Sequence, residues 1–217
     1  MTVLEFVAIN PDLNPGPWLC EEEQRQYKAF RFQKRRMEWL AGRIAAKKLM
    51  RKILGGNPSP KSIQIVFENG GPCAKMGDVL WPISISHSNG LAAAAALKNG
   101  DYVGMDLEVS EPRNPAWLDM AFHDAEKVRG LSDAELTELW TQKEAVLKYL
   151  RLGLKVDLND IRLLPGPHGA RTIRFSNQAE KAWKNQGSPA IRLEKLPVDK
   201  NFALSVAHSH ERTTADN

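Results

Sequence analysis

The sequence has little cysteine and no long hydrophobic run. Only two of its 217 residues are cysteines, Cys20 and Cys73, and their spacing suits neither a metal site nor a redox pair. This usage disfavours a disulfide-stapled scaffold and fits a reducing compartment, so we expect a cytoplasmic protein. No window approaches the roughly 18 uncharged apolar residues of a membrane-spanning helix, so we expect no membrane partner.

Several sequence motifs are also missing. The chain has neither a Walker A motif nor the Rossmann glycine pattern, so a P-loop or dinucleotide-type phosphate site is not expected. It has no G-x-S-x-G nucleophile elbow, which disfavours a serine hydrolase. Residues 1–9 lack a basic segment and contain Glu5 within their apolar run, so we interpret them as a strand and not as a signal peptide.

The composition is that of a globular protein with a basic excess. With 42% hydrophobic and 26% charged residues, the chain can bury the core of one large domain or two small ones. The formal net charge is +4 and the pI is about 9.1. This excess indicates an anionic partner, such as a nucleotide, a nucleic acid, an acidic protein or a membrane surface.

Hydrophobic periodicity predicts an α+β protein. The expected helices are residues 21–28, 34–54, 117–122 and 133–152, and the expected strands are residues 4–9, 63–67, 83–86, 91–97, 102–109, 160–164, 172–175, 190–196 and 202–207. Residues 91–97 include five consecutive alanines, which favour a helix by propensity. We predict a strand there, because the flanking turn signals Asn89-Gly90 and Asn99-Gly100 leave too few residues for a stable helix.

The two halves of the chain resemble each other. Three pairs of segments can be aligned in sequence: 40–51 with 140–151, which aligns Lys48 with Lys148, then 62–65 with 160–163, and 84–88 with 205–209. This repeat predicts a pseudo-two-fold duplication of two α+β lobes with a ligand cleft between them. The lobes would be residues 1–102 and 103–210, followed by a disordered tail, 211–217. Chance similarity between amphipathic helices is the alternative.

Asp106 and Glu108 lie two residues apart on the strand predicted for residues 102–109. Both carboxylates therefore point to one face of the strand, where they repel each other unless a cation lies between them. A hard divalent ion bound through oxygen would satisfy both, so the pair is a candidate half of a Mg²⁺ site. A solvated edge strand is the alternative.

The helix predicted for residues 133–152 carries Trp140, Glu144 and Lys148 at intervals of four, which places them on one ridge. If this helix packs beside the acidic strand, Glu144 becomes a third oxygen ligand and Lys148 can reach a phosphate. The alternative is an ordinary Glu–Lys pair on a solvated helix face.

Ser86 and His87 come at the end of the strand predicted for residues 83–86. Hydroxyl and imidazole groups at a strand end can bind phosphate oxygens, and a histidine beside phosphates would be held protonated. A polar strand terminus without ligand is the alternative.

Together these stretches resemble the 4'-phosphopantetheinyl transferase superfamily, in particular its long, two-lobed Sfp-type branch. The motifs are G-x-P at 70–72, S-H-S at 86–88, G-x-D-x-E at 104–108 and W-x-x-K-E-A-x-x-K at 140–148, followed by Gly153. The resemblance is good over residues 36–154 and loose in the C-terminal strands.

The resemblance implies transfer of phosphopantetheine from coenzyme A to a serine of an acyl or peptidyl carrier protein by a monomeric enzyme. Mg²⁺ would be held by Asp106, Glu108 and Glu144. Glu144, or a metal-bound water, would be the base, and Lys148 would stabilise charge on the phosphoryl oxygens. The coenzyme A contacts would be Arg43, Ser86, His87 and Lys148, with the N-terminal lobe binding most of that substrate. The basic charge would serve coenzyme A and the acidic surface of the carrier.

The sequence departs from the family motifs at one position and matches a further family segment at another. Many relatives have Lys or Arg in the middle of G-x-P, where this chain has Gly71. Lys75 could supply that cation, or it could be lost. Glu126 matches the F-x-x-x-E segment of the family, although a surface helical glutamate would look the same.

Two other function classes fit parts of the pattern. A metal-dependent nuclease also uses acidic strand residues and a lysine, but the residue two positions after Glu108 is Ser110, where the D…E-x-K pattern has lysine. A basic module that binds nucleic acid without catalysis would need aromatic residues on an exposed strand platform. The aromatic residues here fall mainly on amphipathic helices, so we expect no nucleic-acid partner.

Overall fold

The computed structural model describes residues 1–153, 156–166, 170–199 and 201–209. The helices and strands are β1 (Thr2–Ala8), α1 (Glu21–Ala29), α2 (Gln33–Leu54), β2 (Gln64–Glu68), β3 (Gly71–Met76), β4 (Val79–Pro82), β5 (Ser84–Ser88), β6 (Leu91–Leu97), β7 (Val103–Val109), α3 (Pro115–Ala121), α4 (Asp133–Tyr149), β8 (Ile161–Pro165), β9 (Arg171–Phe175), α5 (Asn177–Asn185), β10 (Ile191–Lys195) and β11 (Phe202–Ser209). Short 3-10 turns include η2 (Asp124–Glu126) and η4 (Leu158–Asp160). None of the helices in the described ranges is long and apolar enough to cross a membrane.

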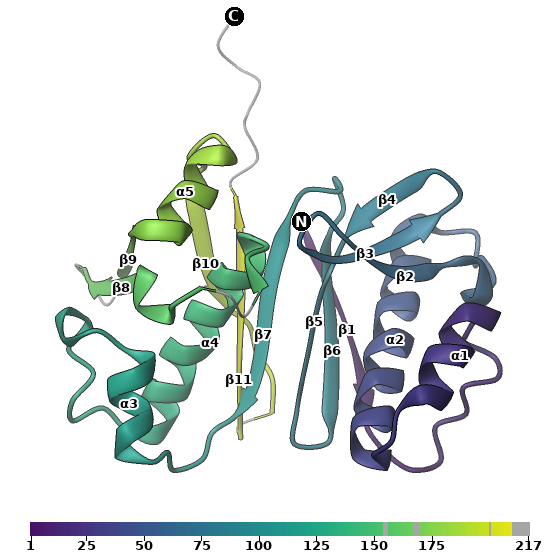
Figure 1. Ribbon diagram of the computed structural model, residues 1–217, viewed down its shortest axis with the longest axis horizontal. Helices are drawn as coiled ribbons and strands as arrows, with labels where there is room; N and C mark the ends of the chain where they lie inside the picture. The colour runs from purple at the N-terminus through teal and green to yellow at the C-terminus, as the bar shows by residue number, and fades with distance from the viewer. Residues whose placement is uncertain (154–155, 167–169, 200, 210–217) are drawn as a thin grey trace, which may run out of the picture.

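Two antiparallel three-stranded sheets form the centre of the molecule (Figure 1). Their strand orders, β1-β6-β5 and β7-β11-β10, match element for element. Helix α2 packs on the first sheet and α4 on the second, so the layers run helix, sheet, sheet, helix (Figure 1). The smaller sheets β2-β3-β4 and β8-β9 also occupy equivalent places in the chain order. The predicted α+β fold with two similar lobes is confirmed.

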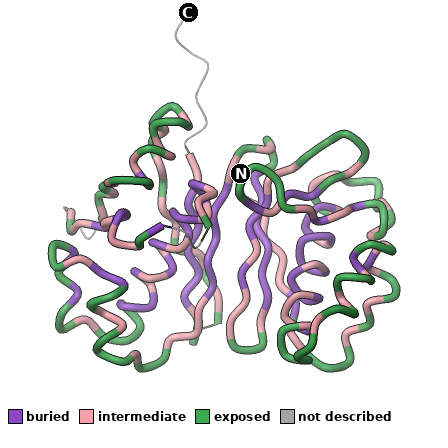
Figure 2. Tube along the Cα trace, viewed as in Figure 1, coloured by how far each residue is buried: buried purple, intermediate pink, exposed green. Residues whose placement is uncertain are grey.

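The alanine-rich segment is strand β6, as predicted, at the centre of the first sheet. Ala92, Ala94 and Ala96 join the core under α2, whereas Ala93 and Ala95 join the core between the sheets. All five are fully buried, and Figure 2 shows the central strands as the most continuous buried part of the fold. Small side chains on both faces let a helix and a second sheet approach the same strand closely.

The predicted register of the repeat is wrong in two places. Lys47 and Lys143, not Lys48 and Lys148, are the equivalent helix positions, because each forms a buried ion pair with a glutamate of its own lobe. Segment 84–88 is the edge strand β5, whereas 205–209 lies in the central strand β11. The predicted matches rested on similar residue types in the sequence. The buried ion pairs and the strand order show which positions of the two lobes are structurally equivalent.

Three elements were not predicted. Strands β3 and β4 lie where the sequence suggested only a turn and a connection, since Gly71, Pro72 and Gly77 interrupt the apolar pattern. Helix α5 lies between two predicted strands and covers part of the second lobe. The predicted tail, 211–217, lies outside the described residues.

Candidate active site

Strands β5 and β7, one from each lobe, are joined by three serines that alternate along β5. Ser84 donates to the carbonyl oxygen of Met105 at 3.2 Å and accepts from its amide at 2.9 Å. Ser86 Oγ donates to Asp106 Oδ1 at 2.7 Å, and Ser88 Oγ donates to Glu108 Oε2 at 2.9 Å. The strand predicted to bind phosphate therefore lies directly against the acidic strand.

The acidic strand also meets the helix with the Trp140, Glu144, Lys148 ridge. Lys148 Nζ donates to Asp106 Oδ1 at 2.6 Å and to Ser86 Oγ at 3.2 Å. Gly104 allows this approach, since a Cβ there would lie 1.8 Å from the carbonyl oxygen of Ala145 in α4. The glycine of G-x-D-x-E thus permits contact between helix and strand backbones.

The carboxylates at this interface influence one another. Burial, with Asp106 as the next cause, raises the pKa of Glu144 from 4.5 to about 7. Burial and then Asp106 also raise the pKa of Glu108 above its usual range, while Ser88 and Arg113 oppose this. Glu144 can consequently exchange a proton near neutral pH, which is the property required of a general base.

The fit to a metal ion rests on Asp106. Among the residues that the structure describes, no three His, Cys, Asp or Glu side chains are arranged to hold a metal ion. Asp106 Oδ2 is nevertheless buried without a hydrogen-bond partner in that part of the chain. With the raised pKa values of Glu108 and Glu144, this oxygen indicates an excess of negative charge that a hard divalent cation would relieve. The donor set fits Mg²⁺, and its binding remains a prediction.

His87 lies at the mouth of the same interface. Its Nε2 is 3.0 Å from Nη1 of Arg35, which lies in the first turn of α2. Burial lowers the pKa of His87, and the nearby cations Arg35 and Lys148 lower it further. This lowered pKa belongs to the protein without bound phosphate, so a histidine held protonated beside phosphates stays a prediction.

Two predicted residues make aromatic contacts outside this cluster. Arg43 stacks on Trp39 with its guanidinium carbon 4.5 Å from the ring centroid, and within the described residues no hydrogen bond or ion pair joins it to His87 or Lys148. Its role in binding coenzyme A remains a prediction. Trp140 packs on Trp117 at a centroid distance of 5.0 Å.

Two arginines were missed, one at the site and one at a contact between the lobes. Arg113 lies 3.7 Å from Glu108 Oε2 and stacks on Trp117. Arg151 follows α4 and donates to the backbone oxygens of Glu68, Asn69 and Gly71 in the other lobe.

The position of Arg151 explains the departure at Gly71. A Cβ on residue 71 would lie 3.0 Å from the Arg151 guanidinium carbon. The guanidinium group of Arg151, from the C-terminal lobe, therefore occupies the space beside Gly71 that a side chain of residue 71 would need. The glycine in place of the expected cation was the only sequence signal for this contact.

Comparison with known proteins places this arrangement in a family. A family model described as the 4'-phosphopantetheinyl transferase superfamily matches residues 102–207. The holo-(acyl-carrier-protein) synthase of Staphylococcus haemolyticus (strain JCSC1435) is 31% identical over 84 residues, covering 36% of this chain and 71% of the relative.

Solved structures give weaker global similarity. A coenzyme A complex of the Chronobacterium ammoniagenes synthase has a TM-score of 0.38 at 20% identity and covers 50% of this chain and 97% of that one. The Neisseria meningitidis holo-(acyl-carrier-protein) synthase has a TM-score of 0.39 at 13% identity and covers 51% and 98%. From the sequence relative and the family model, the chain belongs to the 4'-phosphopantetheinyl transferase superfamily of enzymes.

Proposed function

We propose that this protein transfers the 4'-phosphopantetheine group from coenzyme A to a serine of an acyl or peptidyl carrier protein, in a Mg²⁺-dependent reaction that leaves adenosine 3',5'-bisphosphate. The observation that carries the proposal is the contact of Lys148 with Asp106 and Ser86, which unites residues of both lobes. In this proposal residues 1–102 bind most of coenzyme A, and residues 103–210 supply the acidic strand and the catalytic helix.

The residues of the interface suit phosphoryl transfer to a hydroxyl. Glu144, with a pKa of about 7, takes the proton of the carrier serine as its oxygen bonds to phosphorus. The phosphorus–oxygen bond to the nucleotide breaks at the same centre, and the bisphosphate leaves with the electron pair. Lys148 can exchange its bond to Asp106 for one to a phosphoryl oxygen, and Ser86 and His87 can bind neighbouring phosphate oxygens.

Mg²⁺ held by Asp106, Glu108 and Glu144 would neutralise charge on the pyrophosphate. The orphaned oxygen of Asp106 supports this assignment.

A basic segment reaches the same interface through Arg35. Residues 31–36 contain four Lys or Arg side chains and lead into α2, where Arg35 contacts His87. Such a surface attracts both coenzyme A phosphates and an acidic carrier helix. The two-lobed chain further suggests that one monomer contains a complete site, as in the Sfp-type branch.

The direct test is to incubate the protein with coenzyme A, Mg²⁺ and an apo carrier protein and to measure the intact mass of the carrier. We expect a gain of one phosphopantetheine, abolished by a chelator and by a carrier that lacks the acceptor serine. A carrier of unchanged mass under all conditions, for both fatty-acid and peptide-synthesis carriers, would overturn the proposal.

A further inference from the structure

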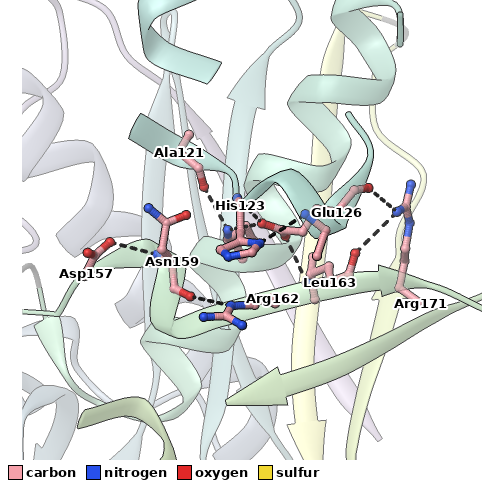
Figure 3. Close-up of polar contacts among 10 residues, drawn as sticks. Ala121, His123, Glu126, Asp157, Asn159, Arg162, Leu163 and Arg171 are labelled. Atoms are coloured by element: carbon pink, nitrogen blue, oxygen red, sulfur yellow. Dashed lines mark hydrogen bonds and ion pairs between the residues drawn. The ribbon is translucent and has the colours of Figure 1, made fainter. Parts of the chain in front are cut away.

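A fully buried ion pair lies behind the catalytic helix, on the side away from β5. Lys143 Nζ in α4 donates to Glu126 Oε2 and to the carbonyl oxygen of Ala121, each at 2.8 Å. Glu126 also accepts from the amides of His123 at 2.8 Å and Leu163 at 2.9 Å (Figure 3). One carboxylate thus connects α4, η2 and β8.

The N-terminal lobe contains the same arrangement. Lys47 in α2 donates to Glu23 and, at 2.7 Å, to the carbonyl oxygen of Trp18. Glu23 accepts from the amides of Cys20 and Ile65, both at 3.2 Å. The two lysines are completely buried, and the two glutamates are 3% and 1% exposed. Each contact in one lobe therefore has a counterpart in the other.

We propose that the ion pair Glu126–Lys143 is a positioning device for catalysis, which sets the rotation and axial register of α4 so that Glu144 and Lys148 face β7. Lys143 directly precedes Glu144, so fixing its side chain fixes the direction of the next one, about 100° further round the helix. The role in catalysis rests on the transfer proposed above.

Directional contacts explain why charged residues occupy this core position. A buried ion pair contributes little net stability compared with well-packed apolar residues, but removal of one partner leaves a costly unpaired charge. An apolar side chain could pack there in several helix rotations, whereas the Lys143 ammonium must meet both Glu126 and the Ala121 carbonyl. The pair therefore selects one placement of α4.

The N-terminal pair provides a matched control, because its helix presents no predicted catalytic carboxylate. We would compare Glu126→Gln and the double variant Glu126→Gln/Lys143→Met with Glu23→Gln and Glu23→Gln/Lys47→Met. Measurements are the carrier-loading kcat, the thermal unfolding midpoint and amide hydrogen exchange. Both single variants should lower the midpoint, with faster exchange confined to the helix of the altered lobe.

The kinetics separate positioning from stability. Glu126→Gln should lower kcat at least tenfold, and the C-terminal double variant should regain the midpoint but not the kcat. Both N-terminal variants should keep at least half of the wild-type kcat at saturating coenzyme A, because α2 is predicted to contribute to binding of that substrate and not to the chemical step. Full recovery of kcat in the C-terminal double variant, or equal losses in both lobes, would overturn the inference.

If wild-type protein loads no carrier, the proposed function fails separately, and hydrogen exchange still tests the ion pair. Unchanged exchange in α4 of Glu126→Gln would then overturn the positioning of α4.

Discussion

The two lobes share one scaffold but differ in the charges that face the neighbouring strand. Glu5 on β1 corresponds to Asp106 on β7, since each pairs with the central strand of its sheet and bonds a lysine of the packed helix. That helix lysine is Lys52 in the first lobe, five residues after the buried Lys47, just as Lys148 follows Lys143. The strand–lysine ion pair is therefore a property of the scaffold.

The remaining charges distinguish the lobes. By the same correspondence, Glu144 aligns with Lys48 and Glu108 with Val7. The first lobe thus lacks the neighbouring carboxylates that, after burial, help to raise the pKa of Glu144. At its edge, β1 and β10 line a cavity of about 610 Å³ in place of the serine contacts between β5 and β7. The two interfaces therefore differ in their carboxylates and in how closely their strands pack.

The largest effect is expected from breaking the two strand–lysine pairs separately. Asp106→Asn should lower carrier-loading kcat/KM by more than about 100-fold, because it removes charge from the predicted metal and phosphate site. Glu5→Gln should change it less than about twofold. Equal losses in the two variants would contradict a single catalytic interface.

Gly104→Ala tests the close approach of α4 to β7 in the second lobe. Its Cβ would lie 1.8 Å from the Ala145 carbonyl oxygen, so α4 must move away from β7. We expect a loss of about 3 kcal/mol in the free energy of unfolding, with transfer reduced at least tenfold. Val3→Ala at the equivalent position of β1 should cost about 1 kcal/mol and preserve transfer, as urea denaturation and loading assays can check.

Sequence patterns predicted the two similar lobes and most of the residues at the site. The predictions that failed did so for physical reasons. The spacing of Asp106, Glu108, Glu144 and Lys148 grouped them as candidates, and the family resemblance predicted that they would meet. The structure brings them together at one interface. The helix register of the repeat could not be predicted, because a buried lysine looks like any surface lysine in sequence. Arg151 was missed because its acceptors are backbone carbonyls, which every residue type has, so the sequence does not reveal them.

Glu144→Gln tests the difference between the lobes through the pH dependence of the free energy of unfolding. The pKa of Glu144 is raised in the folded state, so the folded protein binds this proton more tightly than the unfolded chain, and stability is lost as pH rises from 4.5 to about 7. In protein kept metal-free with a chelator, Glu144→Gln should be more stable than wild type by up to about 2–3 kcal/mol at pH 8. At pH 4 it should show no gain.

The control for this prediction is Glu22→Gln, at an exposed position in α1. It should show no stability gain at either pH. A gain for Glu144→Gln that does not depend on pH would argue against a buried, repelled carboxylate.

The smallest effect concerns the contact between lobes made by Arg151. Arg151→Ala removes a charged donor from three backbone oxygens of residues 68–71, and we expect a loss of about 1–2 kcal/mol in the free energy of unfolding. Arg174→Ala, on the exposed face of β9, should change it by less than about 0.5 kcal/mol. Equal values from denaturant titrations would show that the contact contributes nothing.

The stoichiometry of coenzyme A binding tests the central claim most directly. A duplicated scaffold has two symmetry-related interfaces, but only the one between β5 and β7 contains Ser86, Asp106 and Lys148. Calorimetric titration with coenzyme A and Mg²⁺ should therefore give one site per chain, weakened by Lys148→Met and unaffected by Lys52→Met. Two equivalent sites per chain, or a single site lost in Lys52→Met and kept in Lys148→Met, would contradict the account.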